Sequence, residues 1–332
     1  MRKKVLITGG AGFIGLNLAN KLADLNYKVI IADNFERAVQ DKFLEDSISK
    51  NNISLLNINL LDQKEVMSLD KDFYAIFHLA AIIGVRHVLS RPYSVLYDNI
   101  QLLANIINLC KIQETGFNRL LFASTSEIYA GTLNFYEMQI PTPENTPLTV
   151  SDISEPRTSY MLSKLYGEAL CQQSNLPFTI FRPHNIYGPR MGMSHVIPEQ
   201  MRKAHEAKNG DSIEVFSVEH TRSFCFVDDA IEMLALMFEN KSCEGLTLNL
   251  GSESPEISIL DLVKECHKTL RKDLLILPKE GPPGSPARRA PDMKKTIDIL
   301  GYESRINLSK GLLLTYDWYK DNVFDGETDS AI

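Results

Sequence analysis

The stretch Thr8-Gly9-Gly10-Ala11-Gly12-Phe13-Ile14-Gly15 follows directly on the apolar residues Val5-Leu6-Ile7. This order predicts a strand, a glycine-rich turn and the start of a helix. Glycines suit a tight turn, and they let a pyrophosphate approach the backbone N–H groups at the start of the helix. A second apolar run ends in Asp33, whose carboxylate can bind ribose hydroxyls and would repel a 2′-phosphate. The stretch therefore predicts a dinucleotide site that favours NAD over NADP.

The composition is that of an ordinary soluble globular protein. Of 332 residues, 44% are hydrophobic and 23% are charged, and the formal net charge is −7. The chain can bury a sizeable core, and it offers no broad basic surface for nucleic acid. Five scattered cysteines without a CxxC pair predict buried, reduced thiols. Because no apolar run reaches membrane-spanning length, we expect a cytoplasmic protein with neither nucleic-acid nor membrane partners.

Strand-like and helix-like segments alternate through the first half of the chain. Strands are predicted at 4–8, 28–32, 53–58, 74–79, 119–124, 177–182 and 247–250, with amphipathic helices at 14–25 and 94–112. Such alternation predicts an α/β fold of the Rossmann type, a doubly wound parallel sheet with helices on both faces. Residues 132–157, rich in Pro, Thr and Glu, are expected to form a long loop of the kind that often carries function.

After residue 182, prolines and glycines become frequent, which predicts loops and short helices around a site. We expect two interleaved parts. The NAD-binding domain would comprise residues 1–181 and about 225–255, including a helix at 228–239. The smaller, C-terminal substrate-binding lobe would comprise about 182–224 and 256–325, with a polar tail at 326–332.

Tyr160-Met161-Leu162-Ser163-Lys164 begins a predicted helix that runs to about Gln172. The spacing of four places Tyr160 and Lys164 on one helical face. A phenol with a pKa near 10 is a poor base at neutral pH, but a nearby ammonium or a cationic nicotinamide favours the phenolate. The pair could also be two surface residues one turn apart. The dinucleotide turn upstream favours the catalytic interpretation.

Taken together, the motifs resemble those of the extended short-chain dehydrogenase/reductases. That family holds NAD-dependent nucleotide-sugar epimerases, 4,6-dehydratases and uronate decarboxylases, and the resemblance covers nearly the whole chain. Besides the glycine turn and the Tyr160/Lys164 pair, the matching segments are 78–81, Asn99, 124–129, 182–190, 221–228 and 288–292.

The resemblance implies a role for each matching residue. Tyr160 would take the proton of the sugar 4-hydroxyl as C4 is oxidised by NAD, Lys164 would hold the nicotinamide ribose and lower the tyrosine pKa, and Thr125 would bond the reacting oxygen. NAD contacts are implied for Gly9, Gly12, Phe13, Ile14, Gly15, Asp33, Asn34, Asn59, Leu60, Leu79, Ala80, Ala81, Asn99, Tyr160, Lys164 and Pro183. Pyrophosphate or carboxylate contacts are implied for Asn185, Arg190, Arg222 and Arg289. Arg86 could also contact the substrate, or simply begin a basic surface helix.

The segment Thr125-Ser126-Glu127 separates the possible reactions. A 4-keto sugar with a carboxylate on C5 is a β-keto acid, and a glutamate beside C5 can act as a base or assist loss of carbon dioxide. Thr-Ser-Glu resembles UDP-glucuronate decarboxylases and GDP-mannose dehydratases. In the family, 4-epimerases usually carry a small or apolar residue at the Glu127 position, and many 4,6-dehydratases carry Asp where Ser126 stands.

We therefore expect decarboxylation or dehydration of a UDP- or GDP-linked sugar, with Ser126 and Glu127 joining the catalytic set. A 4-epimerase remains an alternative, as does a non-catalytic NAD-binding sensor or scaffold, and Glu127 could instead cap a loop. Ala130 replaces a usual glycine, Asn59 replaces a common Asp, and 82–91 do not match the decarboxylase pattern, which leaves the sugar open.

Two further expectations concern assembly and metals. In the family, two helices of each subunit form a dimer bundle, and an apolar stripe fits such a bundle or the chain's own sheet. The stripe consists of Leu102, Leu103, Ile106, Ile107 and Cys110. We expect a homodimer.

The seven histidines show no metal-ligand spacing, so no metal is expected.

Overall fold

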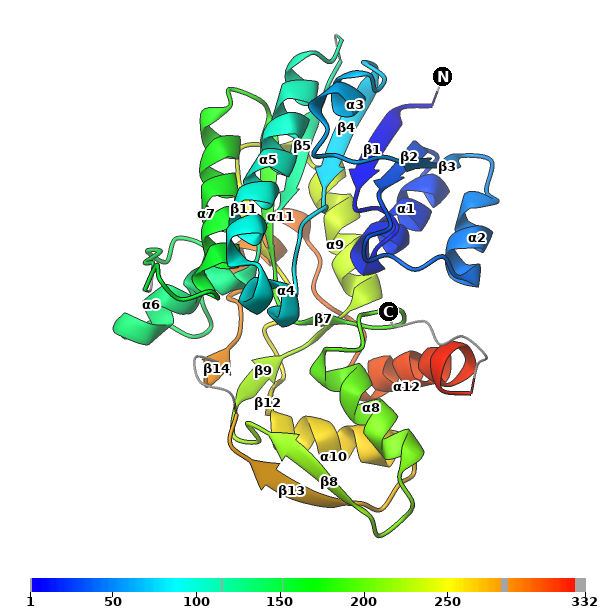
Figure 1. Cartoon of the computed structure of the whole chain (residues 1–332), viewed down its shortest axis with the longest axis vertical. Helices are drawn as coiled ribbons and strands as arrows, with labels where there is room; N and C mark the ends of the chain where they lie inside the picture. The colour runs from blue at the N-terminus through cyan, green and yellow to red at the C-terminus, as the bar shows by residue number, and fades with distance from the viewer. Residues whose placement is uncertain (1, 115, 151, 282–285, 326–332) are drawn as a thin grey trace.

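The computed structural model describes residues 2–114, 116–150, 152–281 and 286–325. Its centre is a sheet of seven parallel strands in the order β11-β6-β5-β4-β1-β2-β3 (Figure 1). The strands are β1 (Lys4–Thr8), β2 (Lys28–Asp33), β3 (Ile53–Asn57), β4 (Phe73–His78), β5 (Arg119–Ala123), β6 (Phe178–Pro183) and β11 (Thr247–Leu250). This confirms the predicted Rossmann-type sheet. The strand order reverses between β1 and β4, where open α/β sheets bind ligands.

Helices cover both faces of the sheet because alternate side chains of each strand point to opposite sides. Val5 and Ile7 of β1 join the core cluster of α1 (Phe13–Asp24) and α9 (Val227–Glu239). Leu6, between them, joins the second cluster with α5 (Pro92–Lys111). The further helices of this body are α2 (Lys42–Ile48), α3 (Gln63–Met67), α4 (Val85–Ser90), α7 (Thr158–Gln173) and α11 (Lys294–Leu300). The core therefore has two layers, one on each face of the sheet.

A smaller lobe lies below the sheet, at the end where the parallel strands finish (Figure 1). Its helices are α8 (Val196–Glu206), α10 (Ile259–Thr269) and α12 (Leu308–Tyr319), with a π-helical end, η3 (Lys320–Phe324). Its strands are β7 (Ile186–Tyr187), β8 (Ser212–Phe216), β9 (Thr221–Ser223), β10 (Cys225–Phe226), β12 (Glu256–Ser258), β13 (Leu275–Lys279) and β14 (Arg288–Arg289). The chain interleaves further than the expected boundaries suggest, because α11 packs on β11 and α9. The predicted tail at 326–332 lies outside the described residues.

Two sequence-based expectations differ from the structure. The predicted loop at 132–157 begins later, because α6 (Ala130–Phe135) follows η1 (Ser126–Tyr129) and the Thr132 hydroxyl donates to the Pro147 carbonyl. The interpretation of the apolar stripe of α5 as part of a dimer bundle is wrong. All its members are buried within the single chain, packed with β4, β5 and β6. The stripe faces the chain's own sheet because that sheet leaves an apolar face to cover.

All five cysteines are buried and unpaired. Among the described residues, no helix combines the length and the apolar character needed to cross a bilayer.

Close packing of α7 on the sheet depends on Gly167. A Cβ there would lie 2.5 Å from Cζ of Phe122, on β5, and 3.1 Å from a methyl carbon of Leu103, on α5. Phe122 is almost fully buried, so its ring has little room to move away. The glycine therefore sets how closely the helix that carries Tyr160 and Lys164 approaches the sheet.

We predict that Gly167→Ala lowers the free energy of unfolding by about 1–2 kcal/mol, because overpacking outweighs the gain in helix propensity of about 1 kcal/mol. Urea unfolding followed by circular dichroism would measure the change. Gln172→Ala, at an exposed position of the same helix, is the control and should stay within about 0.5 kcal/mol of the parent. Equal stability of Gly167→Ala and the parent would contradict the prediction.

Candidate active site

The glycine turn has the shape of a pyrophosphate cradle. Gly9 adopts φ +65°, and a Cβ on it would lie 2.7 Å from the backbone nitrogen of Ala80. A Cβ on Gly15 would lie 2.5 Å from the Gly9 carbonyl oxygen. Gly12 caps α1 without a side-chain acceptor, so N–H groups of the first helical turn remain available to an anion. The turn fits the pyrophosphate of NAD.

Asp33 lies at the end of β2, beside this turn. One carboxylate oxygen accepts from the Ala11 N–H at 3.1 Å, and the other accepts from the Phe35 N–H at 3.0 Å. Burial raises the pKa of Asp33, and the backbone donors at Phe35, Ala11 and Asn34 oppose that rise. Each oxygen retains a lone pair for a ribose hydroxyl, and the negative charge disfavours a 2′-phosphate. The residues present therefore fit NAD.

Most of the other predicted cofactor residues lie where the strands end or where α1 begins. Phe13 and Ile14 begin α1, and Leu79, Ala80 and Ala81 follow β4 at the same edge of the sheet. Pro183 ends β6, Asn34 follows β2, and Asn59 and Leu60 follow β3.

Asn99 is buried on α5, and its side chain bonds to other residues of the chain. Its side chain accepts from the Ile82 N–H at 2.7 Å and donates to the Ile82 carbonyl and the Ser163 hydroxyl. Asn99 thereby fixes the segment after β4 against α7.

Helix α7 brings Tyr160 and Lys164 to the edge of the sheet. Lys164 is buried and donates to the Ala123 carbonyl at 2.7 Å, and its Nζ lies 5.9 Å from the centre of the Tyr160 ring. Tyr160 and Thr125 share a side-chain hydrogen bond. The three predicted members of the Tyr–Lys–Thr set therefore lie together.

The charges around Tyr160 differ from the expectation. Burial is the largest influence and raises the pKa of Tyr160, and the negative Glu127 adds to the rise. The bond from Thr125 and the positive Arg37 oppose it. Lys164 was expected to lower this pKa, yet its ammonium points at the Ala123 carbonyl. The opposing charge in this structure comes from Arg37, which the sequence analysis missed because it lies in an irregular segment after β2.

Glu127, which follows β5 of the sheet, and Arg289, on β14 of the lobe, form an ion pair. Nη1 of Arg289 lies 2.6 Å from a carboxylate oxygen of Glu127, which is half-exposed. The guanidinium lowers the pKa of Glu127, and Arg157 and Arg222 act in the same direction. Ser126 is buried beside it. Glu127 is therefore an ionised carboxylate at neutral pH, held in a cluster of positive charge.

The small sheet β12-β9-β14 explains why the arginines gather there. In the parallel pair of β9 and β14, Arg289 is the register partner of Arg222, so both side chains project from one face. Arg288 projects from the opposite face and binds both carboxylate oxygens of Glu256, at 2.8 and 2.7 Å. Strand alternation thus separates two arginine–glutamate pairs, and only the Arg289 pair involves Glu127.

The predicted substrate residues do not all lie in this cluster. Arg222 donates to the carbonyls of Thr221, Pro286 and Ala287, and Asn185 donates to the Ser223 carbonyl. Arg222 lies on β9 and belongs to the cluster around Glu127, whereas Asn185 lies next to β9.

Arg190 lies elsewhere. It donates to Asp41, to the Ala11 carbonyl and to the Val39 carbonyl. These bonds tie the segment after β2 to the glycine turn, away from Glu127. The side chain of Arg86 lies outside the described residues.

Arg157 belongs to the cluster but was not predicted. It lies three residues before Tyr160. Residues at that spacing are neighbours on a helix, so the sequence could have indicated that Arg157 lies near Tyr160. Across the described residues, no group of three His, Cys, Asp or Glu side chains is arranged to hold a metal ion.

The fold and the site define a Rossmann-type enzyme with a short-chain dehydrogenase/reductase arrangement of Tyr, Lys and Thr. Residues 5–251 match the model of the NAD-dependent epimerase/dehydratase family, and the chain belongs to that family. NAD is its cofactor. The match confirms the family and the enzyme class that the sequence motifs predicted.

Individual relatives add detail. The chain is 32% identical over 335 residues to a UDP-N-acetyl-alpha-D-glucosaminuronate decarboxylase of Bacillus cytotoxicus, covering 97% of this chain and 99% of the relative. It is 31% identical to UDP-glucuronic acid decarboxylase 1 of Xenopus tropicalis, covering 97% and 73%. Among solved structures, UDP-glucuronic acid 4-epimerase from Bacillus cereus, in complex with UDP-glucuronic acid and NAD, superposes with a TM-score of 0.82 at 26% identity, covering 96% and 99%.

The site also predicts a pH-dependent stability. Burial lowers the pKa of Lys164 from 10.5 to about 8. Between those values the unfolded chain binds more protons than the folded chain, so this group makes stability rise with pH. Below about pH 8, the folded state carries the full cost of a buried ammonium, roughly 3 kcal/mol at about 1.4 kcal/mol per pKa unit.

We predict that Lys164→Met is at least as stable as the parent at pH 7, because removing the cost of the buried ammonium, roughly 3 kcal/mol, offsets the loss of the bond to the Ala123 carbonyl, about 1–3 kcal/mol. The difference should shift in favour of the parent between pH 7 and 9.5 in urea unfolding. Lys295→Met is the matched control: Lys295 also donates to a strand carbonyl, that of Thr247 at 2.8 Å, but it is exposed. If the stability difference between Lys164→Met and the parent did not change with pH, the lowered pKa of Lys164 in the folded state would be wrong.

Proposed function

We propose that this protein decarboxylates a UDP-linked uronic acid through a 4-keto intermediate. The main support for this proposal is the Glu127–Arg289 ion pair, which lies beside Tyr160 and Thr125. Arg157 and Arg222 add positive charge around Glu127. A planar guanidinium suits a carboxylate, and several of them favour a substrate with negative charge on the sugar as well as on the diphosphate. The two relatives named as UDP-uronate decarboxylases support this substrate class.

The first step is oxidation at C4. When bound, NAD supplies the acceptor for the hydrogen that leaves C4 with its electron pair. Tyr160 takes the proton of the 4-hydroxyl, and Thr125, which bonds Tyr160, holds the oxygen between them. Because burial raises the pKa of Tyr160, the phenol needs nearby positive charge to act as a base. Lys164, which is held by the Ala123 carbonyl, would hold the nicotinamide ribose.

The second step breaks the bond between C5 and its carboxylate. The electron pair of that bond enters the ketone as an enolate, which takes a proton from water at C5. C4 then takes hydride back, which restores NAD, while Tyr160 returns its proton to the oxygen. Glu127 is ionised, because Arg289 lowers its pKa, so it cannot donate a proton there. Its negative charge disfavours the substrate carboxylate in the ground state, and that repulsion ends as carbon dioxide leaves. The O–H groups of Tyr160 and Thr125 stabilise the enolate oxygen.

A uronate 4-epimerase is the second candidate. The Bacillus cereus structure supports it, since that protein has the same fold and is named for epimerisation of UDP-glucuronic acid. The same arginines would then hold the carboxylate without releasing it. The two functions share the oxidation at C4 and differ only in the later step.

We predict that purified protein converts UDP-glucuronic acid or its 2-acetamido analogue to a product that has lost carbon dioxide, seen by mass spectrometry. A product of unchanged mass would overturn decarboxylation in favour of the epimerase, and loss of water would indicate a dehydratase. UDP-glucose, which lacks the carboxylate, is the substrate control.

Two variants separate the steps. Tyr160→Phe should form no NADH, whereas Glu127→Gln should form NADH and then slow by about 10²–10⁴-fold before product. Single-turnover absorbance would follow both. Glu256→Gln is the matched control, since it weakens the similar pair with Arg288 on the opposite face of the small sheet. Full product formation by Glu127→Gln at the parent rate would make Glu127 structural.

We further propose a cytoplasmic homodimer that pairs through α5 and α7. Their outer faces expose Tyr93, Tyr97 and Tyr166, at 76%, 53% and 52% of their surface. Tyr93 and Tyr97 stack with ring centres 5.8 Å apart. Exposed aromatic residues on adjacent helices are typical of an interface. The free, buried cysteines suit a reducing compartment.

Light scattering at micromolar concentration should therefore report a dimer, and Tyr97→Lys should weaken it because a charge would enter the buried contact. Leu275→Lys is the control, since Leu275 is exposed to a similar degree, 61%, on β13 of the lobe. A parent protein that is a monomer, or dissociation caused equally by both variants, would contradict the proposal.

A further inference from the structure

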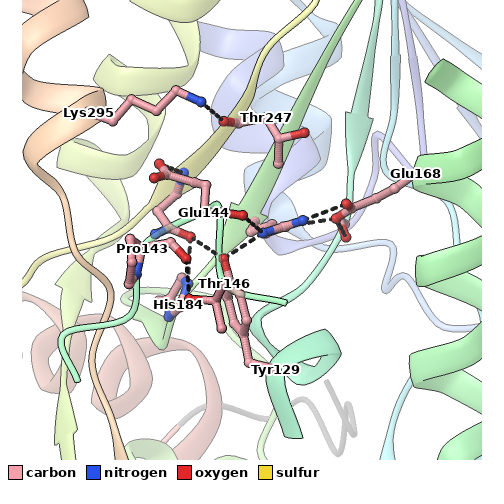
Figure 2. Close-up of polar contacts among 11 residues, drawn as sticks. Tyr129, Pro143, Glu144, Thr146, Glu168, His184, Thr247 and Lys295 are labelled. Carbon is pink, nitrogen blue, oxygen red and sulfur yellow. Dashed lines mark hydrogen bonds and ion pairs between the residues drawn. The ribbon is translucent and has the colours of Figure 1, made fainter. Parts of the chain in front are cut away.

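A buried polar network surrounds the Tyr129 hydroxyl, two residues after Glu127 in the sequence (Figure 2). We propose that this network, joined at the Tyr129 hydroxyl, positions Glu127 against Arg289 and so controls the second step of the reaction. The inference rests on the proposed two-step function, and it adds residues that touch neither substrate nor cofactor. Figure 2 shows Tyr129, Glu144, Glu168 and His184 converging on one region from separate segments.

Glu168 fixes the first end of the Glu127 segment. It lies on α7, one turn after Lys164, and is almost fully buried. One of its oxygens accepts from the Ser124 hydroxyl at 2.5 Å, immediately before Thr125. Its two oxygens also accept from Arg182 at 2.9 and 2.7 Å. The helix that carries Tyr160 is thereby linked to the residues that begin η1.

Tyr129 fixes the second end, two residues after Glu127. Its hydroxyl accepts from Nη1 of Arg182 at 2.6 Å and donates to Oδ1 of Asn249 at 3.3 Å. Burial is the main reason that the pKa of Tyr129 rises to about 12, so the phenol keeps the proton that it donates. With Ser124 and Tyr129 both held, the short segment that carries Glu127 is restrained on both sides.

Asn249 continues the network to Arg289. Its amide donates to the carbonyls of Thr142 and Asp292, at 2.9 and 3.0 Å. Thr142 in turn pairs with the backbone of Ala290 and Asp292, on either side of Pro291. Asn249 therefore restrains the backbone next to Arg289, and the Tyr129–Asn249 bond connects the two partners of the ion pair.

The arrangement favours a positioning role over simple packing. Satisfied buried networks hold their members in one geometry, because every alternative leaves a polar group unpaired. Glu127 and Arg289 are 162 positions apart in sequence, and the network supplies a rigid path between them. A displacement of about 1 Å at a reacting group can cost about 100-fold in rate.

Tyr129→Phe is the test, because it removes one oxygen and leaves Arg182 paired with Glu168 and bonded to the Glu144 carbonyl. In single-turnover experiments with UDP-glucuronic acid or its 2-acetamido analogue, NADH should form within about twofold of the parent rate. Conversion of the 4-keto intermediate to product should slow about 10- to 100-fold, so NADH accumulates. A normal first step also shows that the variant is folded.

Tyr187→Phe is the matched control. Tyr187 is equally buried, but its hydroxyl donates to the Leu308 carbonyl in the lobe, at 3.3 Å, so neither step should change. Equal slowing of both steps by Tyr129→Phe, or slowing of neither, would overturn the positioning role. Failure of the proposed function is seen separately in the parent protein: if its product has kept the carboxylate, decarboxylation is wrong, and the ratio of the two rates still tests the network.

Discussion

The ion pair between Glu127 and Arg289 is the interaction on which the organisation of the site depends. Glu127 follows β5 of the central sheet, and Arg289 lies on β14 of the lobe. The pair brings together the two parts of a chain that each carry half of the site. It also sets the local charge, because the guanidinium keeps Glu127 ionised while the carboxylate offsets a cluster of arginines.

The central sheet provides the fixed reference for this pair. Its strands are parallel, so the turn after β1, Asp33 at the end of β2 and the segment after β5 all meet at one edge. The glycines of the first turn allow the close approach of the backbone to Ala80. Helix α7 then lies against β5 closely enough for Lys164 to bond the Ala123 carbonyl. The cofactor side of the site is thus formed within one compact body.

The substrate side depends on irregular segments and is stabilised differently. The strands of the small sheet β12-β9-β14 are two or three residues long, and such strands hold few ladder bonds of their own. Side-chain bonds supply the missing rigidity: Arg288 with Glu256 on one face of the small sheet, and Asn249 with Thr142 and Asp292 behind it. Buried polar groups are costly unless they are satisfied, so each of these bonds also selects a single arrangement.

The sequence by itself determined the parts of the protein that rest on local patterns. The strand, glycine turn and helix at residues 4–24, the acid at Asp33, and the spacing of Tyr160 and Lys164 are readable because each depends on neighbours a few positions away. The tertiary structure decided what depends on distant partners. It turned the apolar stripe of α5 toward the sheet, placed Arg190 at the glycine turn, and brought Arg157, Arg222 and Arg289 around Glu127. No local spacing encodes those contacts, because they arise only when β9 and β14 pair and the lobe folds back onto the edge of the sheet.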